Sequence, residues 1–160
     1  ENPATRLASI KALGFLQFQP AVEDLKKILR DANRVDTEQL TVVISLGNMG
    51  DHSVIPDLKP LLNHEEVNIR WDAALSLAKL GDISGSHILA NLMDRSYYTS
   101  FPEVDYQEAD QAIMVAIQVS SDFTNEVFKG KLMILASEDK NMGIRNTAIK
   151  TLKHVYGYQS

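Results

Sequence analysis

The chain has 160 residues, of which 44% are hydrophobic and 23% charged, the composition of an ordinary globular protein. It contains no cysteine, which excludes disulfides, thiolate zinc sites and cysteine nucleophiles. The formal net charge of −5 argues against nucleic acid or an anionic membrane as a partner. No apolar run approaches the roughly eighteen residues that span a bilayer. Composition leaves the compartment open between cytoplasm and periplasm.

One stretch of sequence, Arg70–Asp82, recurs along the chain. In register, its copies begin at Arg6, Gln39, Arg70 and Arg145. The first three copies start 33 and 31 residues apart, and each copy has a leucine seven residues after its start. Self-similarity at such a period predicts stacked supersecondary units. Because the sequence starts without Met or a signal-like apolar stretch, we expect it to be part of a longer array.

Apolar residues three and four positions apart predict helices in pairs, separated by breakers such as Gly81-Asp82. In chain order, we expect first helices near 4–17, 36–49, 66–80, 107–120 and 141–156. We expect second helices near 20–30, 53–63, 84–94 and 124–136. Pro60 falls inside one of the second helices and should kink it.

The predicted fold is all-α, because no strand-like alternation persists along the chain. Its architecture is expected to be a right-handed α-solenoid, an α-α superhelix of about four to five stacked helix pairs in one domain. The repeats are expected near residues 4–31, 36–63, 66–94, 107–136 and 141–156. A single helix pair cannot bury both of its flanks, so each repeat depends on its neighbours for stability.

The repeat pattern resembles a known family. Ile-Arg, then alanine, then leucine and Leu-Gly-Asp, as in Ile69–Asp82, is similar to the short HEAT-like repeat of phycobilisome lyase subunits and many bacterial HEAT-repeat proteins. The second copy has Gln39 where the family has arginine, and the fourth lacks both arginine and glycine. The resemblance implies that the repeat positions join adjacent repeats and are structural. These positions are Arg6, Arg70, Gly81, Asp82 and Arg145.

Enzymatic precedents among HEAT-like proteins find little support in the residues. His64-Glu65 occurs once and outside the first helix, which argues against a di-iron hydroxylase. The second helices carry mixed charges rather than the basic stripe of a DNA glycosylase. A bilin-lyase-like enzyme or enzyme subunit remains the alternative to a non-catalytic protein. We expect no metal and no cofactor.

One insertion interrupts the repeats at Ser96–Tyr106 and holds four of the chain's eleven aromatic residues. Insertions in solenoids map to loops on one face, and aromatic side chains are enriched at binding hot spots. The candidate partner-binding residues are Tyr97, Tyr98, Phe101, Glu103, Asp105 and Tyr106. The alternative is that Tyr97, Tyr98 and Phe101 fold back and cover the gap between repeats.

These observations predict a non-catalytic protein–protein interaction or scaffolding module. Six carboxylates and no Lys or Arg lie between Glu103 and Glu126, so we expect a protein or peptide partner with basic character. The competing interpretation of this charge pattern is a solvated acidic face without a partner.

Overall fold

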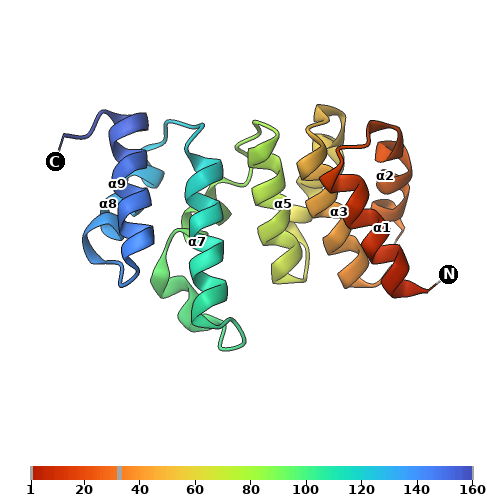
Figure 1. The fold of residues 1–160 in the computed structure, drawn as a ribbon, viewed down its shortest axis with the longest axis horizontal. Helices are drawn as coiled ribbons and strands as arrows, with labels where there is room; N and C mark the ends of the chain where they lie inside the picture. Colours follow the sequence, from red (N-terminus) through yellow and green to blue (C-terminus); the bar gives the residue numbers. More distant parts are fainter. Residues whose placement is uncertain (1, 32–33, 160) are drawn as a thin grey trace. The chain divides into compact units, whose positions relative to one another are not determined.

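The structure, a computed structural model, describes residues 2–31 and 34–159. Within these ranges the regular elements are all helices, in agreement with the predicted all-α class (Figure 1). The chain divides into two compact units, Glu1–Gly85 and Ser86–Ser160, which we call the first and the second unit. Each unit is described by itself, and the superhelical course of the whole chain stays a prediction.

The first unit stacks three long helices side by side. These are α1 (Pro3–Phe15), α3 (Asp36–Met49) and α5 (Val67–Lys79). The helix α2 (Val22–Arg30) packs against α3, and α4 (Ile55–Leu58) lies near α5. Short 3-10 turns complete the second helices, at Gln19–Ala21, His52–Val54 and Lys59–Asn63. Long first helices thus alternate with shorter second helices, which is the repeat-like packing that the sequence predicts (Figure 1).

The second unit contains α6 (Ser86–Leu92), α7 (Tyr106–Ser120), α8 (Glu126–Glu138) and α9 (Met142–Tyr156). The pair α8 and α9 packs closely, while α7 contacts both α6 and α9. The insertion after α6 is not a plain loop, because Arg95–Ser100 forms a 3-10 helix. A fully buried Phe128 anchors the core of this unit together with aliphatic side chains from α7, α8 and α9.

Proline accounts for the largest difference between a predicted and an observed helix. The helix expected near 53–63 is α-helical only over Ile55–Leu58 and continues as the 3-10 turn Lys59–Asn63. Pro60 has no N–H for the α-helical ladder, and its ring clashes with the carbonyl four residues earlier. The predicted kink is therefore a change from α to 3-10 geometry.

Glycine and serine let the first helices of the first unit approach closely. A Cβ added to Gly14 would lie 2.6 Å from the Ser45 Cβ, and one added to Gly47 would lie 2.5 Å from the Ser76 Cβ. The serine hydroxyls add hydrogen bonds across the contact. Ser45 donates to the Ile10 carbonyl at 3.0 Å, and Ser76 donates to the Val43 carbonyl of α3 at 3.1 Å. The glycine–serine contact thus repeats from one helix pair to the next.

Candidate interaction surfaces

Two repeat arginines make the same contact in different units. Arg70 Nη1 donates to the carbonyls of His64 and Glu65 at 2.5 and 2.8 Å, and Arg145 Nη1 donates to the Asp139 carbonyl at 2.5 Å. Each guanidinium reaches back six residues, into the turn that precedes its own helix. Carbonyls at the end of a helix or turn lack intrahelical donors, so each arginine satisfies acceptors that join one repeat to the next.

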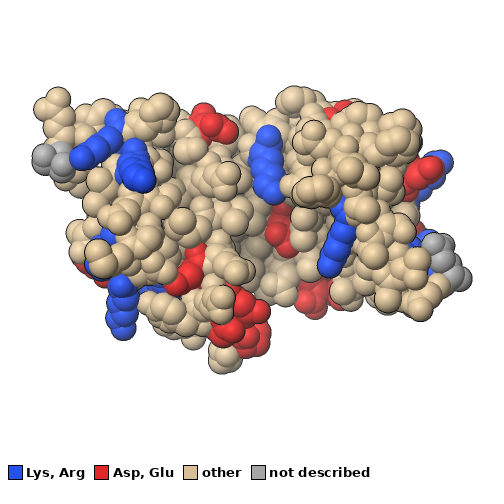
Figure 2. Space-filling view, viewed as in Figure 1, with Lys and Arg blue, Asp and Glu red and all other residues tan. Residues whose placement is uncertain are grey.

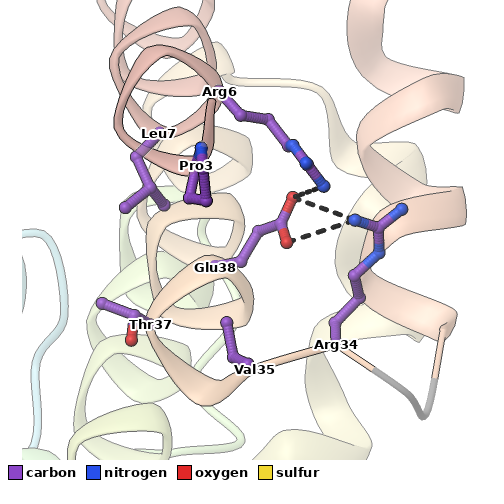
Figure 3. A pocket seen from close by; sticks show the side chains of 7 residues that line it. All are labelled: Pro3, Arg6, Leu7, Arg34, Val35, Thr37 and Glu38. Carbon is purple, nitrogen blue, oxygen red and sulfur yellow. Dashed lines mark hydrogen bonds and ion pairs between the residues drawn. The ribbon is translucent and has the colours of Figure 1, made fainter. Parts of the chain in front are cut away.

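Arg6 takes part in a three-residue ion cluster beside a hollow of about 390 Å³. Glu38, buried at the start of α3, lies 3.7 Å from Arg6 Nη1 and accepts hydrogen bonds from Arg34 Nη1 at 3.3 and 3.4 Å (Figure 3). The single carboxylate lies between both guanidinium groups. This cluster links α1 to α3 and fits the structural role that the repeat resemblance implies for Arg6.

The Gly81-Asp82 breaker links the turn after α5 to the preceding second helix. Gly81 has a φ of 79°, the left-handed conformation that ends a helix at little cost for glycine. Asp82 accepts from the Ser84 amide at 2.9 Å and pairs with Lys59 Nζ at 2.8 Å. One carboxylate therefore caps the turn after α5 and holds the end of the preceding repeat.

The aromatic residues of the insertion pack mainly on one another. Tyr98 is buried, and its hydroxyl donates to the Leu92 carbonyl at 2.8 Å. Burial also raises the pKa of this phenol. The Tyr97 ring contacts Tyr98 and Phe101 edge to face, with centroids 5.9 and 5.0 Å apart. For these three candidate residues, the contacts favour the interpretation in which the insertion folds back and covers the core.

The remaining candidates lie on the surface where the chain enters α7. Asp105 caps this helix by accepting from the Glu108 amide at 2.8 Å, and the Glu108 side chain accepts in return from the Asp105 amide at 2.9 Å. Tyr106 is 54% exposed, and the Arg95 guanidinium lies 4.6 Å from its ring centroid. Glu103 is exposed as well. Figure 2 shows acidic side chains gathered at this end of α7.

A buried ionic network holds the insertion in place, and sequence reasoning did not find it. Arg95 makes a bidentate contact with Asp139, at 3.0 and 2.9 Å, and its Nη2 lies 2.6 Å from Asp110 Oδ1. Asn141 completes the network through its amide to Asp139, at 2.8 Å, and its side chain to Asp110, at 2.5 Å. The Asp139 side chain is fully buried. Arg95 and Asp139 are 44 residues apart, so no local pattern marks the pair.

Next to this network, the second unit has a hollow of about 470 Å³ between the insertion and α8, which we call the insertion hollow. Its apolar lining comes from Met93, Leu135 and Ile134, the last of which is 53% exposed. Its rim carries the hydroxyls of Ser96 and Thr99 and the ion pair of Lys131 with Asp94, at 2.5 Å. An apolar floor with a polar rim is the arrangement of side-chain pockets in protein interfaces.

The rim carboxylate of Asp94 gives the second unit a pH-dependent contribution to stability. Burial raises the pKa of Asp94, but hydrogen bonds from Lys131 and Ser96 together outweigh burial and hold the pKa below its ordinary value. A lowered folded-state pKa stabilises the protein above the unfolded pKa of about 3.9, and this contribution is lost as the pH falls through the folded value.

We therefore expect Asp94→Asn to lower the free energy of unfolding at pH 7 and to lower it much less near pH 3. Urea unfolding at both pH values measures the difference between the two proteins. Glu138→Gln, at an exposed position beside the same hollow, is the control and should show little effect at either pH. An equal loss for Asp94→Asn at both pH values contradicts the expectation.

Larger clusters of metal-binding side chains and membrane-spanning helices are both absent from the described residues. Among them, no group of three or more histidine, aspartate or glutamate side chains could hold a metal ion. None of the described helices is long and apolar enough to span a bilayer. In the His64-Glu65 motif, His64 Nδ1 accepts from the Glu66 amide at 3.1 Å, so this ring takes part in the turn before α5.

The comparison with protein families finds a match for part of the chain. The family described as HEAT repeats matches residues 36–99. Over this segment the chain is similar to HEAT repeats. The segment extends from the start of α3 to Thr99 in the insertion, and it includes both Gly-Asp breakers, Gly50-Asp51 and Gly81-Asp82. No curated protein matches the chain. HEAT repeats generally mediate protein–protein interaction or scaffolding, which gives the surfaces described above a functional context.

Proposed function

We propose that this protein is a non-catalytic interaction module that binds a protein or peptide partner at the insertion hollow. The observation that supports the proposal is the combination of an apolar floor with a rim of hydroxyl and charged groups, next to the insertion that interrupts the repeats. The hollow is wide enough for an apolar side chain. A single Leu or Phe placed there gains about 1.5–3 kcal/mol from burial.

The segment that follows the rim residue Thr99 in the sequence carries exposed carboxylates. These are Glu103, Asp105 and Glu108, four to nine positions after Thr99. A partner segment that carries an apolar anchor and nearby Lys or Arg side chains complements both features. Binding should therefore weaken from low to high salt, because exposed charges are screened over a Debye length of about 10 Å at 0.1 M salt.

The network of Arg95 with Asp139 supports this function indirectly. It fixes the first turn of the insertion to the turn between α8 and α9, on both sides of the hollow. Preorganised binding surfaces lose less conformational entropy when a partner binds. Tyr98 contributes in the same way, since its buried ring and hydrogen bond hold the 3-10 helix against α6.

Selection from a displayed random-peptide library tests the proposal. The selected peptides should carry an apolar residue with basic neighbours, and Ile134→Asp should weaken their binding by at least roughly tenfold, the effect of losing one buried apolar anchor. Val127→Asp is the matched control, because Val127 is an exposed apolar residue of α8 (59%) outside the hollow. Peptides that bind Ile134→Asp as tightly as the unchanged protein contradict the proposal.

A further inference from the structure

The turn between α1 and α2 lacks the residues that end and cap the helices in the later copies. In register, Leu16-Gln17-Phe18 occupies the place of Met49-Gly50-Asp51 and Leu80-Gly81-Asp82. The two later copies place glycine at the left-handed position and an aspartate that caps the next turn. The first copy has glutamine and phenylalanine instead, and Phe18 makes no side-chain capping hydrogen bond.

The glutamine at this turn adopts a strained backbone conformation that neighbouring contacts maintain. Gln17 has a φ of 50° and is, among the described residues, the one non-glycine with a positive φ. Such a conformation costs an L-residue about 1–2 kcal/mol. Two side-chain amides offset this cost, since Gln17 donates to the Asn48 carbonyl at 2.9 Å and Gln19 to the Met49 carbonyl at 2.7 Å. The turn is thereby fixed to the end of α3.

This fixed turn presents large apolar side chains to solvent. Phe15 is 85% exposed, Leu16 70% and Phe18 50%. At the register position of Phe15, the next two copies carry Asn48 and Lys79, both polar. Folding of the first unit gains nothing from a solvent-exposed phenylalanine ring. Rigid exposed aromatic side chains are, in contrast, typical anchors of protein interfaces.

Phe15 forms one wall of a groove of about 300 Å³ between α1 and α3, which we call the α1–α3 groove. Ile44, 37% exposed, lines it from α3 together with the polar side chains of Thr41 and Asn48. The groove is therefore an apolar surface between two parallel ridges of helix. In the view of Figure 2, the face over α1 and α3 is mostly uncharged.

The charges around the α1–α3 groove are basic. Lys11 lines the groove and is exposed, and Lys79 Nζ donates to Asn48 Oδ1 at 2.8 Å at its edge. None of the described residues that line the groove carries a carboxylate. The sequence has no Asp or Glu from Asn2 to Val22. Lys11 attracts an acidic partner directly, while Asp72, which interacts electrostatically with Lys79, lies outside the groove lining.

We propose that the α1–α3 groove docks an acidic amphipathic helix, whose apolar side chains contact Phe15 and Ile44 and whose carboxylates face Lys11 and Lys79. Helix-in-groove recognition requires an apolar groove and anchors three or four positions apart. The proposal goes beyond the function proposed for the insertion hollow: the two surfaces lie in different units, and their partners are opposite in charge.

The test uses two fluorescein-labelled synthetic helical peptides, each of about 16 residues, or roughly 24 Å of helix. Both have leucines along one face; one has glutamates beside them and the other lysines. Fluorescence anisotropy should show saturable binding of the glutamate peptide, at least roughly tenfold tighter than that of the lysine peptide. Phe15→Ala should weaken binding by at least about tenfold, and Lys11→Glu should reverse the preference between the peptides.

Two controls separate this result from other causes. Val127→Ala removes an exposed apolar side chain in the second unit and should leave binding of the glutamate peptide unchanged. The melting temperature of Phe15→Ala should remain that of the unchanged protein, because the ring is exposed. Equal affinity for both peptides, or no saturation, overturns the proposal. Sedimentation velocity that shows dimers lost on Phe15→Ala also overturns it, since another molecule of this chain would then occupy the groove.

Discussion

Replacing Asp139 by alanine is expected to lower the free energy of unfolding of the second unit by about 3–5 kcal/mol. The Asp139 side chain is fully buried and accepts both hydrogen bonds of the Arg95 fork and the amide of Asn141. Its removal leaves a largely desolvated guanidinium without its bidentate partner. Breaking one side of a buried ion pair is more costly than the net contribution of the intact pair.

Urea unfolding followed by circular dichroism measures this loss. Glu138→Ala is the matched control, because Glu138 is the neighbouring residue and is exposed; its effect should stay within about 0.5 kcal/mol. In the double variant with Arg95→Met, only part of the loss should be recovered, because Asp110 then loses its ion pair with Arg95. A small loss for Asp139→Ala, similar to that of Glu138→Ala, contradicts the structural role assigned to the network.

Gly47→Ala is expected to destabilise the first unit by about 1–3 kcal/mol, although alanine favours helices over glycine by roughly 1 kcal/mol. A Cβ at this position would lie 2.5 Å from the Ser76 Cβ and 2.9 Å from the Ser76 Cα, and it would also clash with the Ser76 hydroxyl. A flexible side-chain end could move aside, but the Cα cannot move unless α3 and α5 separate. Chemical unfolding measures the change.

Gly130 in α8 is a control position, where the same substitution is expected to stabilise the protein. A Cβ there meets nothing within 4 Å, so Gly130→Ala should stabilise the protein by about 0.5–1 kcal/mol through helix propensity alone. The double variant Gly47→Ala with Ser76→Gly should lose less free energy of unfolding than the two single variants lose in sum, because the closest clashing atoms are gone. Stabilisation by Gly47→Ala would falsify the close approach between the helices.

The sequence predicts the helices well where their causes are local. Apolar spacing places the first helices, and the Gly-Asp breakers mark the turns after α3 and α5. Pro60 predicts an interruption of the second helix that contains it, because its missing N–H removes a hydrogen bond within that helix. The second helices are less well predicted, and α6 is shorter than expected, since short helices with 3-10 ends carry weaker periodicity.

The insertion shows the limit of the sequence for the candidate surfaces. Its aromatic residues indicate an unusual segment, but composition leaves both binding and packing open. The hydrogen bond of Tyr98 with Leu92 and the edge-to-face contacts of Tyr97 favour packing for that part. Tyr106 remains exposed, so one segment contributes to both the core and the surface. The partner-binding role of its exposed residues stays a prediction.

The sequence by itself determined the all-α class and the repeat period, because helix periodicity and turn chemistry act over a few residues. Only the tertiary structure decided which polar groups are buried together and which apolar groups are left exposed. Arg95 meets Asp139 across 44 residues, and Gly47 meets Ser76 across a helix interface. The exposure of Phe15 likewise depends on what packs around it, which a local pattern does not specify.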